Sequence, residues 1–269
     1  MPELPDVEIF KQYLDATSLH KLIEKVEVNN ATVLAGVSAS ELSRTLRGRR
    51  FESARRHGKY LLVQLDDGSW LILHFGMTGY LKCFQDQDQE PAHSRLCLSF
   101  DNGFHLAFVC QRMLGKVSLA RDAESFLAEK DIGPDALILD FPTLQELLEG
   151  RKAAIKSILM NQKLIAGLGN IYTDEILFQA GLNPATPVSR LGEEQLQDVF
   201  EAIKQVLRTA IDCRADPDQM PRFFLLPQRH PEGKCPHCHH RLARCKIAGR
   251  TTYYCPYCQA GGKGHRTIS

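Results

Sequence analysis

The sequence has 269 residues, of which 43% are hydrophobic, and its formal net charge at pH 7 is +1. This length and composition fit two domains with buried cores or one large domain, and they exclude a chain that is disordered throughout. No run of 18 apolar residues occurs, and the first 30 residues have neither the basic nor the apolar region of a secretory signal. We therefore expect a cytoplasmic protein with no membrane partner.

The first eight residues, MPELPDVE, predict the start of a helix. Pro5 suits the first helical position, and Asp6 and Glu8 suit the positive end of a helix. This interpretation leaves Pro2 and Glu3 unexplained. In a chemical alternative, removal of the initiator methionine exposes Pro2 as a secondary amine, which can attack an aldehyde carbon and form an iminium. The N-terminus alone does not decide between the two.

Short runs with alternating apolar residues follow the first helix and predict an antiparallel β-sandwich or barrel. Hairpin signals occur at 66–68 (DDG) and 101–103 (DNG), and one helix near 40–46 interrupts the strands before Gly48. The expected strands are LIEKVEV, RFESARRH, KYLLVQLD, WLILHF, RLCLSF, FHLAFV and KVSLA. We expect residues 1–120 to form an N-terminal β-sandwich domain with flanking helices.

A linker is expected over 121–142, where acids, glycine and proline are frequent. Beyond it the apolar period becomes helical, with segments near 143–149, 152–161, 170–180 and 192–212. The fold class is therefore α+β. We expect a helical domain over 143–229, a metal-binding hairpin over 230–259 and a tail over 260–269.

Four cysteines near the end of the chain have the spacing C-x2-C-x16-C-x2-C, which is typical of one structural Zn²⁺ held by four thiolates. They are Cys235, Cys238, Cys255 and Cys258. The residues between the two pairs alternate and predict a β-hairpin. Because four thiolates complete a tetrahedral site, we interpret Cys245, His237, His239 and His240 as surface or packing residues, and the zinc as structural and not catalytic.

Positive charge is concentrated at this end of the chain. Residues 230–269 contain seven Lys or Arg and one acid, a local balance of +6, so the preceding residues carry −5. A second phosphate-binding feature is the stretch 163–178, KLIAGLGNIYTDEILF, in which two glycines separate two helical patterns and Asn170 begins the second. Its N–H groups can face a phosphate. Together these features favour duplex DNA as the partner, with RNA binding or a structural role as alternatives.

Five motifs occur in an order that resembles the formamidopyrimidine-DNA glycosylase/endonuclease VIII family of base-excision repair. They are PELP at 2–5, RRHGKYLL around Lys59, LHFGMTG at 73–79, GLGNIY at 167–172 and the terminal cysteine hairpin. PELP places the chain nearer the formamidopyrimidine branch. The resemblance implies a helix-two-turn-helix domain for 143–229, a monomer that binds damaged double-stranded DNA, and, for 1–120, the catalytic role.

The resemblance also implies a bifunctional DNA glycosylase and abasic-site lyase, acting at the bacterial nucleoid. Pro2 would attack C1′ of a flipped-out nucleotide, and β- and δ-elimination would follow from the iminium. Glu3 would shuttle protons, and Lys59 would act as an acid near the sugar and the 3′ phosphate. Two rival interpretations are a catalytically silent protein that binds damaged DNA and a zinc-ribbon nucleic-acid-binding regulator.

The same resemblance implies the DNA contacts. His74, Asn170 and Arg250 would bind phosphates, and Met77, Arg112 and Leu114 would fill the gap that the flipped base leaves. The chain departs from the family pattern at 110–115, where CQRMLG replaces DPRRFG, so Leu114 stands in place of a stacking phenylalanine. Asp6 replaces the usual glutamate, which puts a supporting hydrogen bond in doubt.

A third departure is the short stretch 210–235, which is rich in proline and leaves little room for the glycine-containing loop that covers a flipped purine in the family. We therefore expect formamidopyrimidine, hydantoin and oxidised pyrimidine lesions to be preferred over 8-oxoguanine, because they are weakly stacked and depend less on a covering loop.

Overall fold

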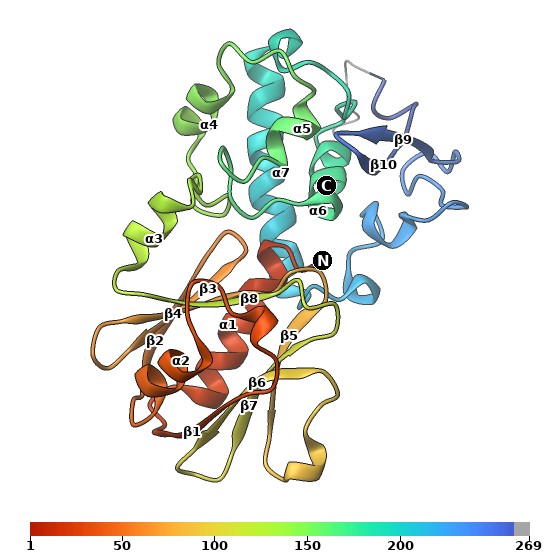
Figure 1. Ribbon diagram of the computed structural model, residues 1–269. Coiled ribbons are helices and arrows are strands. Elements are labelled where there is room, and N and C mark those ends of the chain that lie inside the picture. The colour runs from red at the N-terminus through yellow and green to blue at the C-terminus, as the bar shows by residue number, and fades with distance from the viewer. Residues whose placement is uncertain (261–269) are drawn as a thin grey trace. The chain divides into compact units, whose positions relative to one another are not determined.

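The structure, a computed structural model, describes residues 1–260 apart from the side chain of Gln87 (Figure 1). The chain divides into two compact units, residues 1–131 and the residues from Ile132 onward, and each is described by itself. The expected tail lies outside the described residues except for Ala260. In the described part, no helix is long and apolar enough to cross a membrane.

Two four-stranded antiparallel sheets form the first unit, with the strand orders β1-β6-β7-β5 and β2-β3-β4-β8. Alternate residues, such as Leu61 and Val63 of β3 or Leu96 and Leu98 of β6, lie in one shared core. The expected antiparallel sandwich is therefore confirmed. The strands are β1 (Ile23–Val28), β2 (Phe51–His57), β3 (Tyr60–Leu65), β4 (Trp70–His74), β5 (Gly79–Phe84), β6 (Ser94–Phe100), β7 (His105–Cys110) and β8 (Lys116–Ala120).

The two hairpin signals lie where the sequence predicts them. Gly68, with φ +85°, joins β3 to β4, and Gly103, with φ +78°, joins β6 to β7. Strand β5 was not among the expected strands. It lies at a sheet edge and pairs with β7, and its exposed Tyr80 and Lys82 alternate with buried Gly79 and Leu81.

Three α-helices accompany these sheets: α1 (Leu4–Ser18), α2 (Ala39–Leu46) and α3 (Ala123–Glu129), with 3-10 turns η1 (Ala31–Val33) and η2 (Gln87–Gln89). Glu3 is the N-cap of α1, so Pro5 occupies the second helical position and not the first. The segment 121–142 contains α3, which the sequence analysis did not expect. Asp122 caps α3 by accepting the N–H of Ser125 at 2.7 Å, and Leu127 is buried.

The second unit is helical and ends in a β-hairpin. Helix α7 buries one face that includes Val199, Ile203 and Val206, and it packs against α6. Strand β10 also packs against α6. The elements are α4 (Phe141–Leu148), α5 (Ile155–Leu159), α6 (Asn170–Gln179), α7 (Glu193–Asp212), the 3-10 turns η3 (Val188–Arg190), η4 (Pro217–Gln219) and η5 (Leu226–Gln228), and strands β9 (Ala243–Ile247) and β10 (Arg250–Tyr254).

Candidate functional site

The N-terminal residues are held by the start of α1. Pro2 is half-buried, and the Glu3 side chain that follows it is only 1% exposed. The backbone N–H of Glu3 donates to Oδ2 of Asp6 at 2.8 Å, so Asp6 caps the start of α1. Burial raises the pKa of the Asp6 carboxyl to about 6. The backbone next to Pro2 is therefore fixed from inside the helix.

An ion pair that the sequence analysis did not single out connects α1 to the turn between β2 and β3. Arg56, whose side chain is 5% exposed, donates through Nε to Oε2 of Glu8 at 2.8 Å. A second nitrogen of the same guanidinium, Nη1, donates to the carbonyl of Gly58 at 3.4 Å. The only local signal is the motif RRHGKYLL, because the partner lies 48 residues away. One side chain thus ties the helix of Pro2 and Glu3 to the turn that carries Lys59.

Lys59 and His74 lie close together in the first unit. Lys59 occupies the two-residue turn after Gly58, which has φ +54°, and the next residue, Tyr60, pairs with His74 across β3 and β4. The Tyr60 and His74 rings are 5.0 Å apart. Burial, and then the charge of Lys59, lower the pKa of His74. Nδ1 of His74 accepts the N–H of Gly76 at 3.3 Å, so the neutral ring presents its proton on Nε2.

Two turns of the first unit pack against each other and carry the residues expected to fill the base gap. A side chain at Gly76, which has φ +60°, would place Cβ 2.4 Å from the carbonyl carbon of Leu114. Gly115 closes the second turn by donating its N–H to Sγ of Cys110 at 3.3 Å. This close approach brings together Met77 and the 111–114 turn. Three apolar side chains are well exposed here, Met77 (37%), Met113 (38%) and Leu114 (47%), beside the exposed Arg112.

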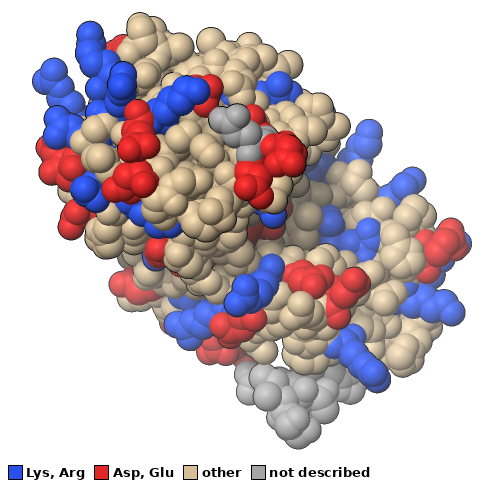
Figure 2. Space-filling view, turned by 90° about the horizontal axis from the view of Figure 1, so that it is seen from below, with Lys and Arg blue, Asp and Glu red and all other residues tan. Residues whose placement is uncertain are grey.

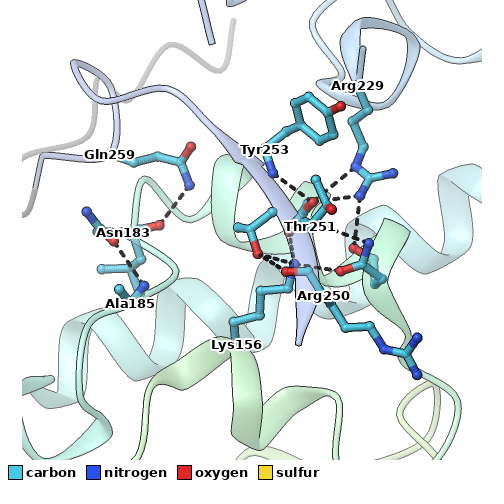
Figure 3. A network of polar contacts seen from close by, with 12 residues as sticks. Lys156, Asn183, Ala185, Arg229, Arg250, Thr251, Tyr253 and Gln259 are labelled. Atoms are coloured by element: carbon cyan, nitrogen blue, oxygen red, sulfur yellow. Dashed lines mark hydrogen bonds and ion pairs between the residues drawn. The ribbon is translucent and has the colours of Figure 1, made fainter. Parts of the chain in front are cut away.

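In the second unit, Asn170 and Arg250 are connected by the contact between α6 and the hairpin. Asn170 begins α6, and its Nδ2 donates to the carbonyl of Thr251 at 3.0 Å. Arg250 precedes Thr251 at the start of β10 and is exposed. Its guanidinium points away from the polar contacts beneath it (Figure 3).

Those polar contacts converge on Lys156, a completely buried residue of α5. Its Nζ donates to Oδ1 of Asn170 at 2.7 Å, to Oδ1 of Asp174 at 2.5 Å and to Oγ1 of Thr252 at 2.7 Å. On the other side, Oδ2 of Asp174 accepts from Nη2 of Arg229 at 2.7 Å. This network was not expected from the sequence, because AAIKSILM shows a single lysine in an apolar helix.

The four cysteine sulfurs lie within 4.8 Å of one another, in a group whose members alternate between buried and half-buried. The Cys235–Cys258 and Cys238–Cys255 sulfurs are 3.7 and 3.4 Å apart. Two thiolates at tetrahedral positions about 2.3 Å from a metal lie about 3.8 Å apart, so this donor set fits a four-coordinate ion. The knuckle of Cys255 is tied to the end of α6 through Gln259, whose Nε2 donates to the carbonyl of Leu182 at 2.8 Å.

The neighbouring histidines lie outside this sulfur group. His237 packs on Phe178 with ring centroids 4.8 Å apart, and His240 stacks on Tyr257 at 4.0 Å. Five exposed basic residues surround the hairpin: Lys234, Arg241, Arg244, Lys246 and Arg250. On the face that Figure 2 shows, Lys and Arg are interspersed with Asp and Glu and form no continuous positive surface. The five exposed basic residues of the hairpin region are available for an anionic partner.

A sandwich with a capped N-terminal proline segment, together with a helical unit that ends in a four-thiolate hairpin, defines the architecture of a DNA glycosylase. The sequence model of the formamidopyrimidine-DNA glycosylase N-terminal domain matches residues 1–117, and that of the formamidopyrimidine-DNA glycosylase H2TH domain matches residues 132–220. The chain belongs to the formamidopyrimidine-DNA glycosylase family of base-excision repair, as the resemblance implied.

Relatives and solved structures agree with this assignment. The formamidopyrimidine-DNA glycosylases of Desulfitobacterium hafniense and Gluconobacter oxydans are 34% and 37% identical, with 96% of this chain and 100% of theirs covered. The Lactococcus lactis enzyme in complex with DNA containing N7-benzyl-Fapy-dG has a TM-score of 0.88 and 27% identity, covering 97% of this chain and 100% of that one. A MutM complex with DNA containing carbocyclic 8-oxo-G has a TM-score of 0.87, 27% identity and the same coverage.

The packed turns generate a stability prediction. Gly76→Ala should lower the free energy of unfolding by about 3 kcal/mol, because the new methyl group adds overpacking against Leu114 to the strain of a positive φ. Gly48→Ala is the matched control: its φ is +77°, but a Cβ there meets nothing within 4 Å, so it should cost about 1 kcal/mol. Urea denaturation of both variants measures the difference, and equal losses would contradict the close packing of the two turns.

Proposed function

We propose that the protein is a bifunctional DNA glycosylase and abasic-site lyase whose nucleophile is the amine of Pro2, exposed by removal of Met1. The amine nitrogen forms a bond to C1′, the bond between C1′ and the damaged base breaks, and the base leaves with a proton. The C1′–O4′ bond of the sugar then breaks as O4′ takes a proton, which leaves an iminium between the Pro2 nitrogen and C1′. The iminium withdraws electrons, and β- and δ-elimination then break the C3′–O and C5′–O bonds. Glu3 moves protons at the sugar, and Lys59 acts as an acid near the 3′ phosphate.

The observation that carries this proposal is the order at the chain terminus. Chain ends are poorly ordered in most domains unless something ties them down. Here Glu3 and Leu4 are buried directly behind Pro2, and the bond from Glu3 N–H to Asp6 fixes the backbone between them. A nucleophile needs this kind of positioning, because catalysis depends on holding reacting atoms in the right geometry.

Damaged double-stranded DNA is the proposed partner, bound by a monomer in the cytoplasm. His74, through Nε2–H, and Asn170 and Arg250 bind phosphates, and Met77, Arg112 and Leu114 fill the base gap. Solved relatives include complexes with DNA that contains N7-benzyl-Fapy-dG or an abasic site, which supports the partner. In this division of labour 1–120 is the catalytic domain, 121–142 the linker, 143–229 the helix-two-turn-helix domain and 230–259 the zinc hairpin.

The proposed metal is one structural Zn²⁺, because four thiolates at these distances suit zinc and leave no position for a substrate water. When bound, it holds the fold of the hairpin. Cys235, Cys238, Cys255 and Cys258 would hold it, and Arg250 then presents its guanidinium to a phosphate.

The proposed lesion preference follows from how the segment before the hairpin is fixed. The buried carboxylate of Glu175 accepts the N–H groups of Leu225 and Leu226 at 3.1 and 2.7 Å. Phe224 is buried as well, and Gly233 approaches the carbonyl of Gln228 so closely that a Cβ would lie 1.8 Å away. Burial raises the pKa of Glu175 to about 7. A segment tied at so many points is poorly suited to fold over a flipped purine.

The nucleophile is tested by trapping. Borohydride should reduce the iminium and leave a protein–DNA adduct with wild-type protein on an abasic-site duplex. Pro2→Gly should form less adduct, and an uncleaved N-terminal tag should form none, because its terminal amine is displaced from Glu3. The yield of adduct is measured on a denaturing gel. Full trapping by the tagged protein would contradict the assignment of Pro2 as the nucleophile.

The hairpin is tested by two substitutions with one control. Cys238→Ser should weaken DNA binding while the first unit stays folded, since metal binding stabilises only the hairpin. Arg250→Ala should weaken binding by about tenfold or more and reduce the salt slope by about one, without loss of zinc. Arg241→Ala is the control, because Arg241 is exposed and already paired with Glu232 at 2.9 Å. Equal losses for the two arginine variants would contradict a specific role for Arg250.

The lesion preference is tested by single-turnover excision on matched duplexes. Formamidopyrimidine, hydantoin and dihydropyrimidine lesions should be released faster than 8-oxoguanine opposite cytosine. Leu114→Phe should sharpen discrimination between opposite bases by restoring an aromatic face, whereas Leu114→Met should not. An 8-oxoguanine rate equal to the hydantoin rate would show that the tied segment does not restrict the purine.

A further inference from the structure

The buried ammonium of Lys156 has all three of its hydrogens engaged, by Asn170, Asp174 and Thr252. These partners come from α6 and from strand β10, which are separated by more than 70 residues in the sequence. A buried charge without partners is strongly destabilising, so the positions of these groups are coupled to one another. None of the roles assigned to the catalytic residues uses Lys156.

The ammonium determines which way the Asn170 amide faces. An ammonium group has three donors and no acceptor, so only the amide oxygen of Asn170 can face it. The amide nitrogen must then point toward the hairpin, where one N–H binds the carbonyl of Thr251. Within residues 1–260 the second N–H makes no other hydrogen bond, and Asn170 is only half-buried. One donor of fixed direction is therefore left for a ligand.

The same ammonium fixes the strand that carries Arg250. Thr252 binds Lys156 through its hydroxyl and Thr251 binds Asn170 through its carbonyl, so β10 is tied at the two residues after Arg250. Figure 3 shows the Arg250 guanidinium extending away from this tie. A single buried group thus sets the direction of both side chains that the proposed function assigns to phosphates in the second unit.

The charges beneath these two residues also favour an anion. Asp174 is completely buried and lies between two cations, since Oδ1 binds Lys156 and Oδ2 binds Arg229. It also accepts the N–H of Tyr253 at 3.1 Å. Two cations therefore flank the Asp174 carboxylate in a poorly solvated site, where electrostatic interactions are stronger than in water.

We propose that Lys156 is a positioning residue for phosphate binding: it orients the Asn170 amide and the Arg250 strand so that both face the same backbone phosphate of DNA. The phosphate itself rests on the proposed function, whereas the orientation of the amide does not. Lys156 touches no DNA in this proposal and acts through its partners.

The first experiment measures the amide directly, in the protein without DNA. In Lys156→Met, which keeps the side-chain length but has no donor, the ¹⁵N-labelled side-chain amide pair of Asn170, assigned by its loss in Asn170→Ala, should shift and exchange faster with water. Lys152→Met, which removes an exposed lysine just before α5, is the control and should leave that pair unchanged. An unchanged pair in folded Lys156→Met would overturn the proposal.

The second experiment is a double-mutant cycle on binding to a duplex with a stable abasic-site analogue. Lys156→Met and Asn170→Ala should each weaken binding by about tenfold, and the double variant should bind no worse than the weaker single variant, because both changes remove one interaction. Losses that multiply would show that Lys156 acts independently of Asn170, against the proposal. Lack of binding by wild-type protein would instead contradict the proposed function, and the amide signal would still test Lys156.

Thr252→Val covers the case in which Lys156→Met does not fold, as judged by circular dichroism and zinc content. It deletes one hydroxyl and leaves the ammonium with two partners. The Asn170 side-chain amide signals should then shift slightly from their wild-type positions, because the ammonium is still present. DNA binding should weaken by a few fold. No shift and no loss of affinity would overturn the proposal.

Discussion

The position of the proposed catalytic residues in the first unit depends on the ion pair between Glu8 and Arg56. The proposed nucleophile lies at a chain terminus, and this ion pair holds the helix that follows it. Apolar packing of Leu4 and Val7 holds α1 against the sheet, but apolar contacts are non-directional and permit small rotations. A nearly buried guanidinium bound to the Glu8 carboxylate fixes the helix in one orientation. The same guanidinium also donates to the carbonyl of Gly58. One side chain therefore contacts both the helix that follows Pro2 and the turn that carries Lys59.

The second unit also contains a buried ion pair, between Lys156 and Asp174, and it belongs to a larger hydrogen-bond network. Buried ion pairs add little net stability, because desolvation opposes their attraction, so their retention is better explained by the geometry they impose. Lys156 and Asp174 connect α5, α6 and β10 at three points. In the proposed function, a metal held by the four cysteines stabilises the fold of the hairpin, whereas the Lys156 network connects the hairpin to α6. We therefore expect loss of either to affect the position of Arg250.

Sequence alone was sufficient where the signal is local. Alternating apolar residues predicted seven strands, turn residues predicted two hairpins, and fixed cysteine spacing predicted the sulfur cluster. It failed where a partner is distant. Arg56 and Glu8 are 48 residues apart, and Lys156 and Thr252 are 96 apart, so no window of sequence contains either pair. Strand β5 was missed although its signal is local, since exposed Tyr80 and Lys82 alternate with buried Gly79 and Leu81.

The packing of the two turns limits the expected effect of having Leu114 where the family has a phenylalanine. Gly76 and Gly115 fix the backbone of both turns, whatever side chain occupies the tip. We therefore expect Leu114 to lose the stacking of an aromatic ring without a shift of Met77 or Arg112. An aromatic contact adds about 0.5–1.5 kcal/mol beyond its buried area, which corresponds to a change of about two- to tenfold in an equilibrium constant. In the proposed function the three exposed apolar side chains would still exclude water from the gap, so we expect base flipping to be supported while the identity of the opposite base is read less strictly.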